Sequence, residues 1–338
     1  MTFDVRLLTL SYFCAKVFFM HPLFSFIRTR LLQGQKVMLL TVVDREGSSP
    51  GKTGFKMAVA SDGSFTGSIG GGVMEHRLSE QAKRLLKQEK TLSPFLVFQD
   101  HDPEASQNRS GMICSGGQTI AFTPLSQQDL PAVTALVSAL EKEKKGVFAL
   151  SEKGFAFQEN VVLGKSSESR IVSENQWEYH EQTGMPDTLY IFGGGHVGLA
   201  LSKVFSNLNF KIVLFDNRQG LNTFEENLFA GEKQIVDYRK AASLVPEGFN
   251  IYVVIVTFAH KSDEQVLEQM LGKNIKYLGM MGSDKKIETI FNNLREKGFT
   301  EEQFSKVHAP VGYPINSETP AEIAVSIAAE IIAVKNGR

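Results

Sequence analysis

Thr188-Leu189-Tyr190-Ile191-Phe192-Gly193-Gly194-Gly195-His196-Val197-Gly198 is the stretch that decides the fold of the C-terminal half. Its apolar start predicts a buried strand, and the apolar spacing over residues 197–208 predicts a helix. Between them, Gly193 permits a tight turn, Gly195 lets the backbone approach a pyrophosphate, and Gly198 lets the helix pack closely on the strand. Because a helix N-terminus attracts phosphate, the stretch predicts a Rossmann-type nucleotide-binding turn.

The side chains around this turn do not decide which nucleotide binds. Asp216 follows Gly193 by 23 residues (216 − 193), at the end of a predicted strand, where an acid would meet a ribose 2′-hydroxyl. Arg218 keeps both NAD and NADP open. The structural alternative is a Rossmann fold that has lost its ligand. The candidate contacts in this half are Gly193, Gly194, Gly195, His196, Val197, Gly198 and Asp216.

The rest of the C-terminal half alternates between apolar strands and amphipathic helices. This alternation predicts a parallel, doubly wound sheet, and we expect a Rossmann-type domain over residues 187–338. His260 with Asp263, and Gly282 with Ser283, follow predicted strands and so lie at the carboxyl edge, where ligands bind in such sheets. Ser283 is therefore a further candidate contact, with capping of the next helix as the alternative.

The N-terminal half has the shorter strand signals of a mixed α+β domain. We expect this domain over residues 20–180, with the boundary at residues 181–187, which contain Gly, Pro and polar residues. A second glycine cluster, Gly70-Gly71-Gly72, lies between a predicted strand and a predicted helix. Its successive backbone N–H groups could cradle an anion. The alternative is a tight turn in which Glu75 already occupies the positive end of the helix.

Cys114 is the one chemically distinctive side chain of this half. It lies in a long polar loop just before Gly116-Gly117, and surroundings of that kind lower a thiol pKa and suit a soft metal. The alternative is a small buried core residue. The other cysteine, Cys14, receives no role, and no Cys/His spacing indicates a zinc site. Two cysteines form no disulfide framework and fit a reducing cytoplasm.

Composition excludes several classes of protein. A chain of 338 residues with 42% hydrophobic and 22% charged residues is typical of a globular protein with two domains. Net charge is −1 without a basic block, which argues against nucleic-acid binding. The apolar segment 7–27 is interrupted by charges and is too broken to span a membrane. We expect an amphipathic helix at about residues 22–33, with residues 1–19 as an upstream extension before Met20.

Taken together, the motifs resemble the xanthine dehydrogenase accessory protein family, XdhC/CoxI. The resemblance covers about residue 37 to the C-terminus. The matching stretches are Gly47-Ser48-Ser49-Pro50-Gly51, Gly67-Ser68-Ile69-Gly70-Gly71-Gly72, Cys114 with Gly116-Gly117, Phe192 to Gly198, Phe215-Asp216-Asn217-Arg218, Leu278-Gly279-Met280-Met281-Gly282-Ser283, Pro310-Val311-Gly312 and Glu318-Thr319-Pro320-Ala321-Glu322-Ile323-Ala324. Two positions depart from the family pattern: Val73 stands where a cysteine is usual, and Ser115 interrupts the usual Cys-Gly-Gly.

The resemblance implies a cytoplasmic chaperone that binds the molybdenum cofactor, as molybdopterin or its dinucleotide. Such proteins support sulfuration of the cofactor, for which a cysteine desulfurase is the expected partner, and deliver it to a xanthine dehydrogenase-type molybdenum hydroxylase. A homodimer stays open. The resemblance adds Ser49 and Gly70–Gly72 as expected cofactor contacts and Cys114 as the only cysteine left to meet molybdenum. The rivals are an NAD(P)-dependent oxidoreductase, for which no convincing proton-transfer pair is found, and a nucleotide-sensing regulatory module.

Overall fold

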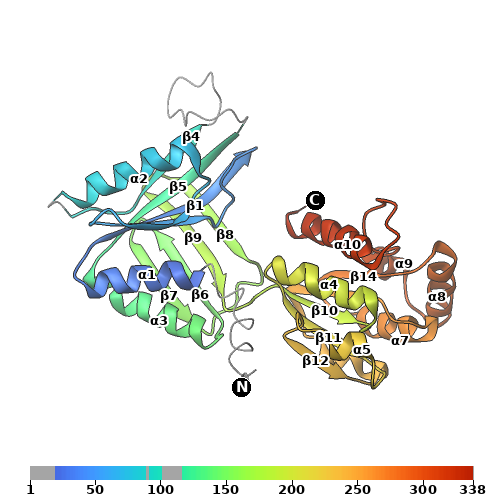
Figure 1. The fold of residues 1–338 in the computed structure, drawn as a ribbon. Coiled ribbons are helices and arrows are strands. Elements are labelled where there is room, and N and C mark those ends of the chain that lie inside the picture. Colours follow the sequence, from blue (N-terminus) through green and yellow to red (C-terminus); the bar gives the residue numbers. More distant parts are fainter. Residues whose placement is uncertain (1–19, 89–90, 101–115, 338) are drawn as a thin grey trace, which may run out of the picture. The chain divides into compact units, whose positions relative to one another are not determined.

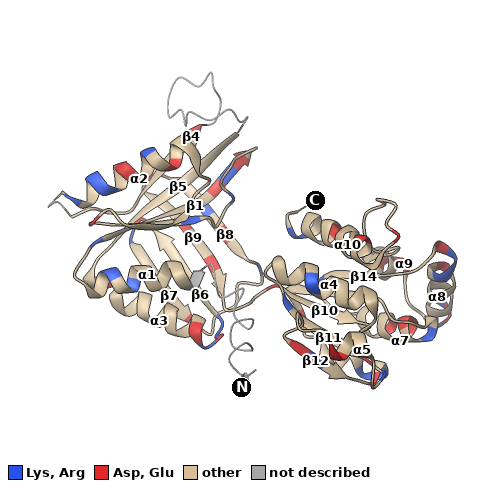
Figure 2. Cartoon of the chain, in the orientation of Figure 1, with Lys and Arg blue, Asp and Glu red and all other residues tan. Residues whose placement is uncertain are grey.

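The computed structural model describes residues 20–88, 91–100 and 116–337 (Figure 1). These residues form two compact units, and the chain passes from one to the other between Met185 and Pro186. Lys and Arg are interspersed with Asp and Glu over both units (Figure 2), as a net charge of −1 leads one to expect. Within the described ranges, no helix has the length and apolar character needed to cross a membrane.

The described residues of the N-terminal unit form two antiparallel sheets and three α-helices. The first sheet has the order β3-β2-β1-β5-β4, and the second has the order β7-β6-β9-β8. The strands are β1 (Val37–Gly47), β2 (Lys56–Ala60), β3 (Phe65–Ser68), β4 (Phe95–Asp100), β5 (Gly116–Leu125), β6 (Gly146–Ser151), β7 (Gly154–Glu159), β8 (Ser167–Ser173) and β9 (Gln176–Thr183). The helices are α1 (Met20–Leu32), α2 (Gly72–Leu86) and α3 (Leu130–Glu141), with a 3-10 turn at Gln127–Asp129.

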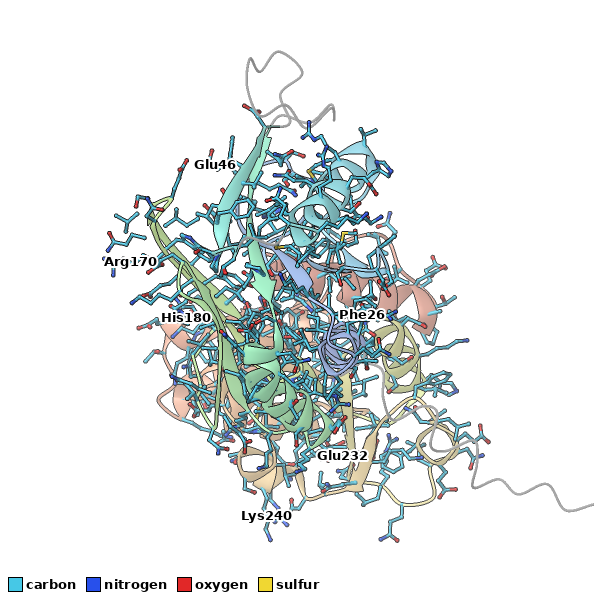
Figure 3. The ribbon with its side chains drawn as sticks, turned by 90° about the vertical axis from the view of Figure 1, so that its left-hand side faces the viewer. Phe26, Glu46, Arg170, His180, Glu232 and Lys240 are labelled. Atoms are coloured by element: carbon cyan, nitrogen blue, oxygen red, sulfur yellow. The ribbon has the colours of Figure 1, made fainter. Side chains whose placement is uncertain are left out.

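Strand β1 is the centre of this unit, and its sequence shows why. Residues 37–43 are all buried, because both faces of the strand are covered. Met38 and its alternate neighbours pack with α2, while Leu39 and its alternate neighbours pack with α1, α3 and the second sheet. A strand covered on both sides reads as one continuous apolar run. At the outer edge, β8 is mostly exposed, and Figure 3 shows Arg170 of this strand pointing outward.

A buried ion pair joins the two sheets. Lys56 Nζ of β2 lies 2.6 Å from a carboxylate oxygen of Glu181 on β9. Tyr179 O–H donates to the same carboxylate, and the Lys56 ammonium lies 5.2 Å from the centre of the Phe148 ring. Residues 181–183, expected in the boundary segment, are the end of β9. The chain passes to the second unit between Met185 and Pro186.

We predict that Lys56→Met strongly destabilises the N-terminal unit. The substitution leaves the Glu181 carboxylate buried without its counter-ion, which costs about 3–5 kcal/mol. Lys144→Met is the matched control, because Lys144 forms a similar 2.6 Å pair with Glu159 on the surface, where such pairs contribute about 0–1 kcal/mol. Trp177 is the only tryptophan and is buried in this unit, so its fluorescence during urea unfolding reports on this unit alone. Equal losses in the two variants would contradict the prediction.

The C-terminal unit is a six-stranded parallel sheet with helices on both faces, so the predicted Rossmann-type fold is confirmed. Its strands are β10 (Thr188–Phe192), β11 (Lys211–Asp216), β12 (Glu232–Ile235), β13 (Gly248–Ile255), β14 (Ile275–Met280) and β15 (Val307–His308), in the order β12-β11-β10-β13-β14-β15. The order reverses between β10 and β13, and in open α/β sheets a ligand binds at the carboxyl ends of the strands at this switch point.

Two layers of helices cover this sheet. Helices α4 (His196–Asn207) and α10 (Pro320–Lys335) pack on one face, and α7 (His260–Met270) and α8 (Asp284–Glu296) pack on the other. The shorter elements are α5 (Asn222–Glu225), α6 (Ala241–Leu244), α9 (Glu301–Phe304) and a 3-10 turn at Tyr238–Lys240. Thr319 caps α10, since its side chain accepts from Glu322 N while the Glu322 carboxylate accepts from Thr319 N. These layers leave the carboxyl ends of the strands open at the switch point.

Candidate functional site

A pocket of about 710 Å³ lies at the carboxyl ends of the central strands of the C-terminal unit. Its wall contains residues 195–197 of the glycine turn, and Arg218 with residues 220–223 after β11. Residues 256–258 after β13 and Met281 after β14 complete it. The volume is in the range of sites for small molecules and cofactors. The pocket therefore occupies the place where the sequence predicts a nucleotide.

The glycines of the turn divide into two kinds. Gly193 has φ 122°, and a β-carbon on it would lie 2.3 Å from Val256 O. A β-carbon on Gly198 would lie 2.0 Å from Gly193 O, so both positions require glycine for the turn to close. Gly195 differs, because it has φ −72° and a β-carbon there would meet nothing within 4 Å. Gly195 thus leaves free space at the start of α4, beside the pocket.

Asp216 lies beneath the glycine turn and has no exposed surface. Gly194 N donates to Oδ2 at 2.7 Å, and the Arg218 backbone N donates to Oδ1 at 2.9 Å. The Arg218 guanidinium adds a two-pronged contact, from Nε to Oδ1 at 2.9 Å and from Nη2 to Oδ2 at 2.8 Å. Burial acts to raise the pKa of Asp216, but these hydrogen bonds outweigh it and hold the pKa below its ordinary value. The carboxylate is therefore ionised and fully used by the protein itself.

Gly194 is held from both sides. Its N–H donates to Asp216, and its carbonyl accepts from Thr223 Oγ1 at 2.6 Å. A β-carbon on Gly194 would lie 2.6 Å from the Phe224 ring. The end of β11 and the segment after it therefore fix the position of Gly194 in the middle of the turn. The N-terminal end of α4 lies beside the pocket. His196 is exposed and Val197 is half-buried at that end.

Arg218 and Phe258 form a rim that sequence reasoning described only in part. The Arg218 guanidinium carbon lies 4.4 Å from the centre of the Phe258 ring, a cation–π contact. Phe258 is 65% exposed although it is large and apolar. Its signal in the sequence is an aromatic residue shortly after a buried strand, and none of the sequence motifs includes it. The two side chains come from the loops after β11 and β13.

A second buried carboxylate fixes the neighbouring loops. Asp263 Oδ1 accepts from Thr257 Oγ1 at 2.6 Å and from Thr257 N at 3.1 Å, and its other oxygen is paired with Lys286. Lys286 also donates to Met281 O at 3.0 Å. Burial raises the pKa of Asp263 in spite of these partners. Among the described residues, Asp263 makes no hydrogen bond or ion pair with His260, and its partner Lys286 was not anticipated from the sequence. Ser283 caps α8 by accepting from Lys286 N.

In the second glycine cluster, a carboxylate of the same unit accepts the backbone hydrogen bonds. Gly70, Gly71 and Gly72 all have positive φ. The Glu75 carboxylate accepts from Ile69 N at 2.9 Å and from Gly71 N at 3.0 Å, where an anion would otherwise bind. The structure thus corresponds to the tight-turn alternative rather than to the anion cradle.

Ser49 holds a loop together in the same unit. Its hydroxyl donates to Gln118 Oε1 at 2.6 Å, and Gln118 Nε2 donates to Ile69 O at 3.1 Å. Cys114 lies outside the described residues, so its expected role stays a prediction from sequence. Among the residues that the structure describes, no group of three His, Cys, Asp or Glu side chains could hold a metal ion.

Comparison with known proteins identifies the family. Residues 189–331 match the XdhC Rossmann domain, and residues 31–97 match the XdhC and CoxI family. This chain belongs to the XdhC/CoxI family. The matched residues include parts of both units, and in the C-terminal unit they include the glycine turn, the Asp216–Arg218 pair and the Lys286 loop.

The relatives of this XdhC/CoxI chain are distant. It is 27% identical over 300 residues to the uncharacterized protein YqeB of Escherichia coli, covering 87% of this chain but only 43% of YqeB. It is 24% identical over 325 residues to a Bacillus subtilis protein named as a probable xanthine dehydrogenase subunit, covering 89% and 94% of the two chains. A crystal structure from Bacillus halodurans, described as a xanthine dehydrogenase, has the same fold, with TM-score 0.64, 23% identity and coverage of 93% and 96%.

We predict that Gly195→Val abolishes binding of a phosphate-bearing ligand without unfolding the protein. The free space and ordinary φ at Gly195 tolerate a side chain, which then fills the place of the phosphate. Gly272→Val is the matched control, since Gly272 also has free space but lies outside the pocket wall. Calorimetric titration with adenine nucleotides measures the difference, and circular dichroism checks the fold. Unchanged affinity in Gly195→Val would rule out the glycine turn as the phosphate site.

Proposed function

We propose that this XdhC/CoxI protein binds the molybdenum cofactor, as molybdopterin or its dinucleotide, and delivers it to a xanthine dehydrogenase-type molybdenum hydroxylase. The observation that carries the proposal is the pocket beside the start of α4, with free space at Gly195. Both forms of the cofactor carry a phosphate group, which the helix N-terminus would stabilise. Membership of the family, and a relative named as a probable xanthine dehydrogenase subunit, support the choice of client.

The residues of the pocket fit the phosphate-bearing part of this cofactor. The backbone at residues 195–197 would hold a phosphate, and Asn222 offers a further polar group in the wall. When bound in its client, the cofactor supplies a redox-active molybdenum centre. The chain's own part is to bind the phosphate, keep the ligand out of water and release it. We include in the proposal that sulfuration, with a cysteine desulfurase as partner, precedes delivery.

The composition of the pocket wall disfavours the oxidoreductase alternative. General acid–base catalysis needs a group of suitable pKa within hydrogen-bond reach of the substrate. In the described part of the chain, the wall contains no carboxylate, lysine or tyrosine, and His196 is its one imidazole. Asp263 and Lys286, which hydrogen-bond to the wall residues Thr257 and Met281, are paired with each other. Binding without turnover is the function that such a wall supports best.

The test is transfer to a client. The protein is purified from a molybdenum-replete host, its released ligands are identified by mass spectrometry, and it is mixed with an apo molybdenum hydroxylase. We expect activation by the loaded wild type and by loaded Gly272→Val, but not by Gly195→Val from the same host. No activation by loaded protein, together with NAD(P)H oxidation on a panel of carbonyls or alcohols, would establish the oxidoreductase instead.

We also predict that Cys114→Ser lowers the molybdenum retained by the purified protein. Serine has nearly the same size but lacks the soft sulfur ligand. We expect the free energy of unfolding to change by no more than about 1 kcal/mol, as for a tolerated surface substitution. Metal analysis and urea unfolding provide the two measurements. A variant that loses stability and keeps its molybdenum would instead make Cys114 a core residue.

A further inference from the structure

The carboxylate at the end of β11 has no acceptor position left for a ligand. In dinucleotide-binding sheets, an acid here accepts a hydrogen bond from a ribose hydroxyl. Two carboxylate oxygens have about four lone-pair positions, and Asp216 already receives four hydrogen bonds from Gly194 N and from Arg218. Its side chain is also inaccessible to solvent. A ribose diol in the pocket would therefore find no free acceptor on Asp216.

Arg218, a hydrogen-bond donor, lines the pocket where Asp216 does not. The Arg218 side chain is 33% exposed and belongs to the pocket wall. Asp216 engages its Nε and Nη2, and Phe258 lies against the guanidinium. For Nη1, no partner is found in the part of the chain that the structure describes. The guanidinium is thus held in one orientation with one donor group still available.

The charges around the pocket favour an anion at this place. Hydrogen bonding to Asp216 raises the pKa of Arg218 further, so the guanidinium stays charged. The described residues of the wall include no carboxylate, and the Asp216 carboxylate that balances the charge of Arg218 lies outside the wall. Arg218 and the backbone at residues 195–197 belong to different segments of the wall, so the pocket has two separate places for negative charge.

We propose that the ligand of this pocket carries a second anionic group of the phosphate class, bound by Arg218 at the carboxyl end of β11, besides the phosphate at the glycine turn. A ligand with two phosphate groups, such as a dinucleotide or a nucleotide phosphorylated on its ribose, matches this arrangement, whereas the hydroxyls of a ribose find no free acceptor on Asp216. The inference rests on the proposed function in one respect only, that a phosphate-bearing ligand occupies this pocket.

The test compares two probes that differ by one phosphate. Isothermal titration of the full-length protein with 2′,5′-ADP and with 5′-AMP gives the ratio of the two affinities. We expect 2′,5′-ADP to bind at least about tenfold more tightly, because a charge-assisted hydrogen bond to Arg218 is gained. The ratio should fall as salt concentration rises. Equal affinities, or no binding of either probe, would overturn the inference.

Variants assign the effect to Arg218. Asp216→Asn/Arg218→Gln removes the guanidinium without leaving an unpaired buried carboxylate, and we expect its affinity ratio to approach one. Arg239→Gln is the matched control, since Arg239 makes the same two-pronged contact with Asp237 two residues earlier but is exposed and outside the pocket wall. A double variant that keeps the wild-type ratio would exclude Arg218. Molybdenum retention and client activation are measured separately, so this inference can fail while delivery stands.

Discussion

The glycine turn of the Rossmann unit depends on one carboxylate. Asp216 accepts from the Gly194 N–H and from Arg218, and through these contacts it joins the end of β11 to the start of α4. A buried backbone N–H without a partner costs about 1–3 kcal/mol, so the position of Gly194 is strongly specified. The space at Gly195 and the orientation of Arg218 both follow from that position. The pocket is in this sense organised around Asp216, although the Asp216 side chain does not reach it.

In both glycine turns of the chain a carboxylate accepts a hydrogen bond from a backbone N–H, but only in the N-terminal unit does that carboxylate fill the place of an anion. In the N-terminal unit, Glu75 accepts from Ile69 N and Gly71 N at the start of α2 and so fills the place of an anion. In the C-terminal unit, Gly194 is the residue of the turn whose N–H donates to Asp216, and the space beside Gly195 remains free. The difference is the origin of the carboxylate. Glu75 belongs to the helix that the turn begins, whereas Asp216 comes from the neighbouring strand.

This contrast shows which parts of the site were predictable from sequence. Local signals found the strand and the glycine turn, because each depends on residues only a few positions apart. The position of Asp216 at the end of a strand was also predicted. Its hydrogen bonds were not, because its four donors can be identified only from the positions of Gly194 and Arg218 in the fold. Lys286 and Glu181 carry no local signal of burial. Each is paired with a residue from a distant part of the chain, Asp263 and Lys56 respectively.

Two charged pairs immobilise the loops around the pocket before any ligand arrives. Asp216 with Arg218 fixes the loop after β11, and Asp263 with Lys286 connects the loops after β13 and β14 through Thr257 and Met281. A buried ion pair is poor evidence for stability, because desolvation of both charges offsets most of their attraction. Its benefit here is geometric. A wall that is already ordered loses less conformational entropy when it binds a ligand, so this order would raise the affinity of the proposed binding step.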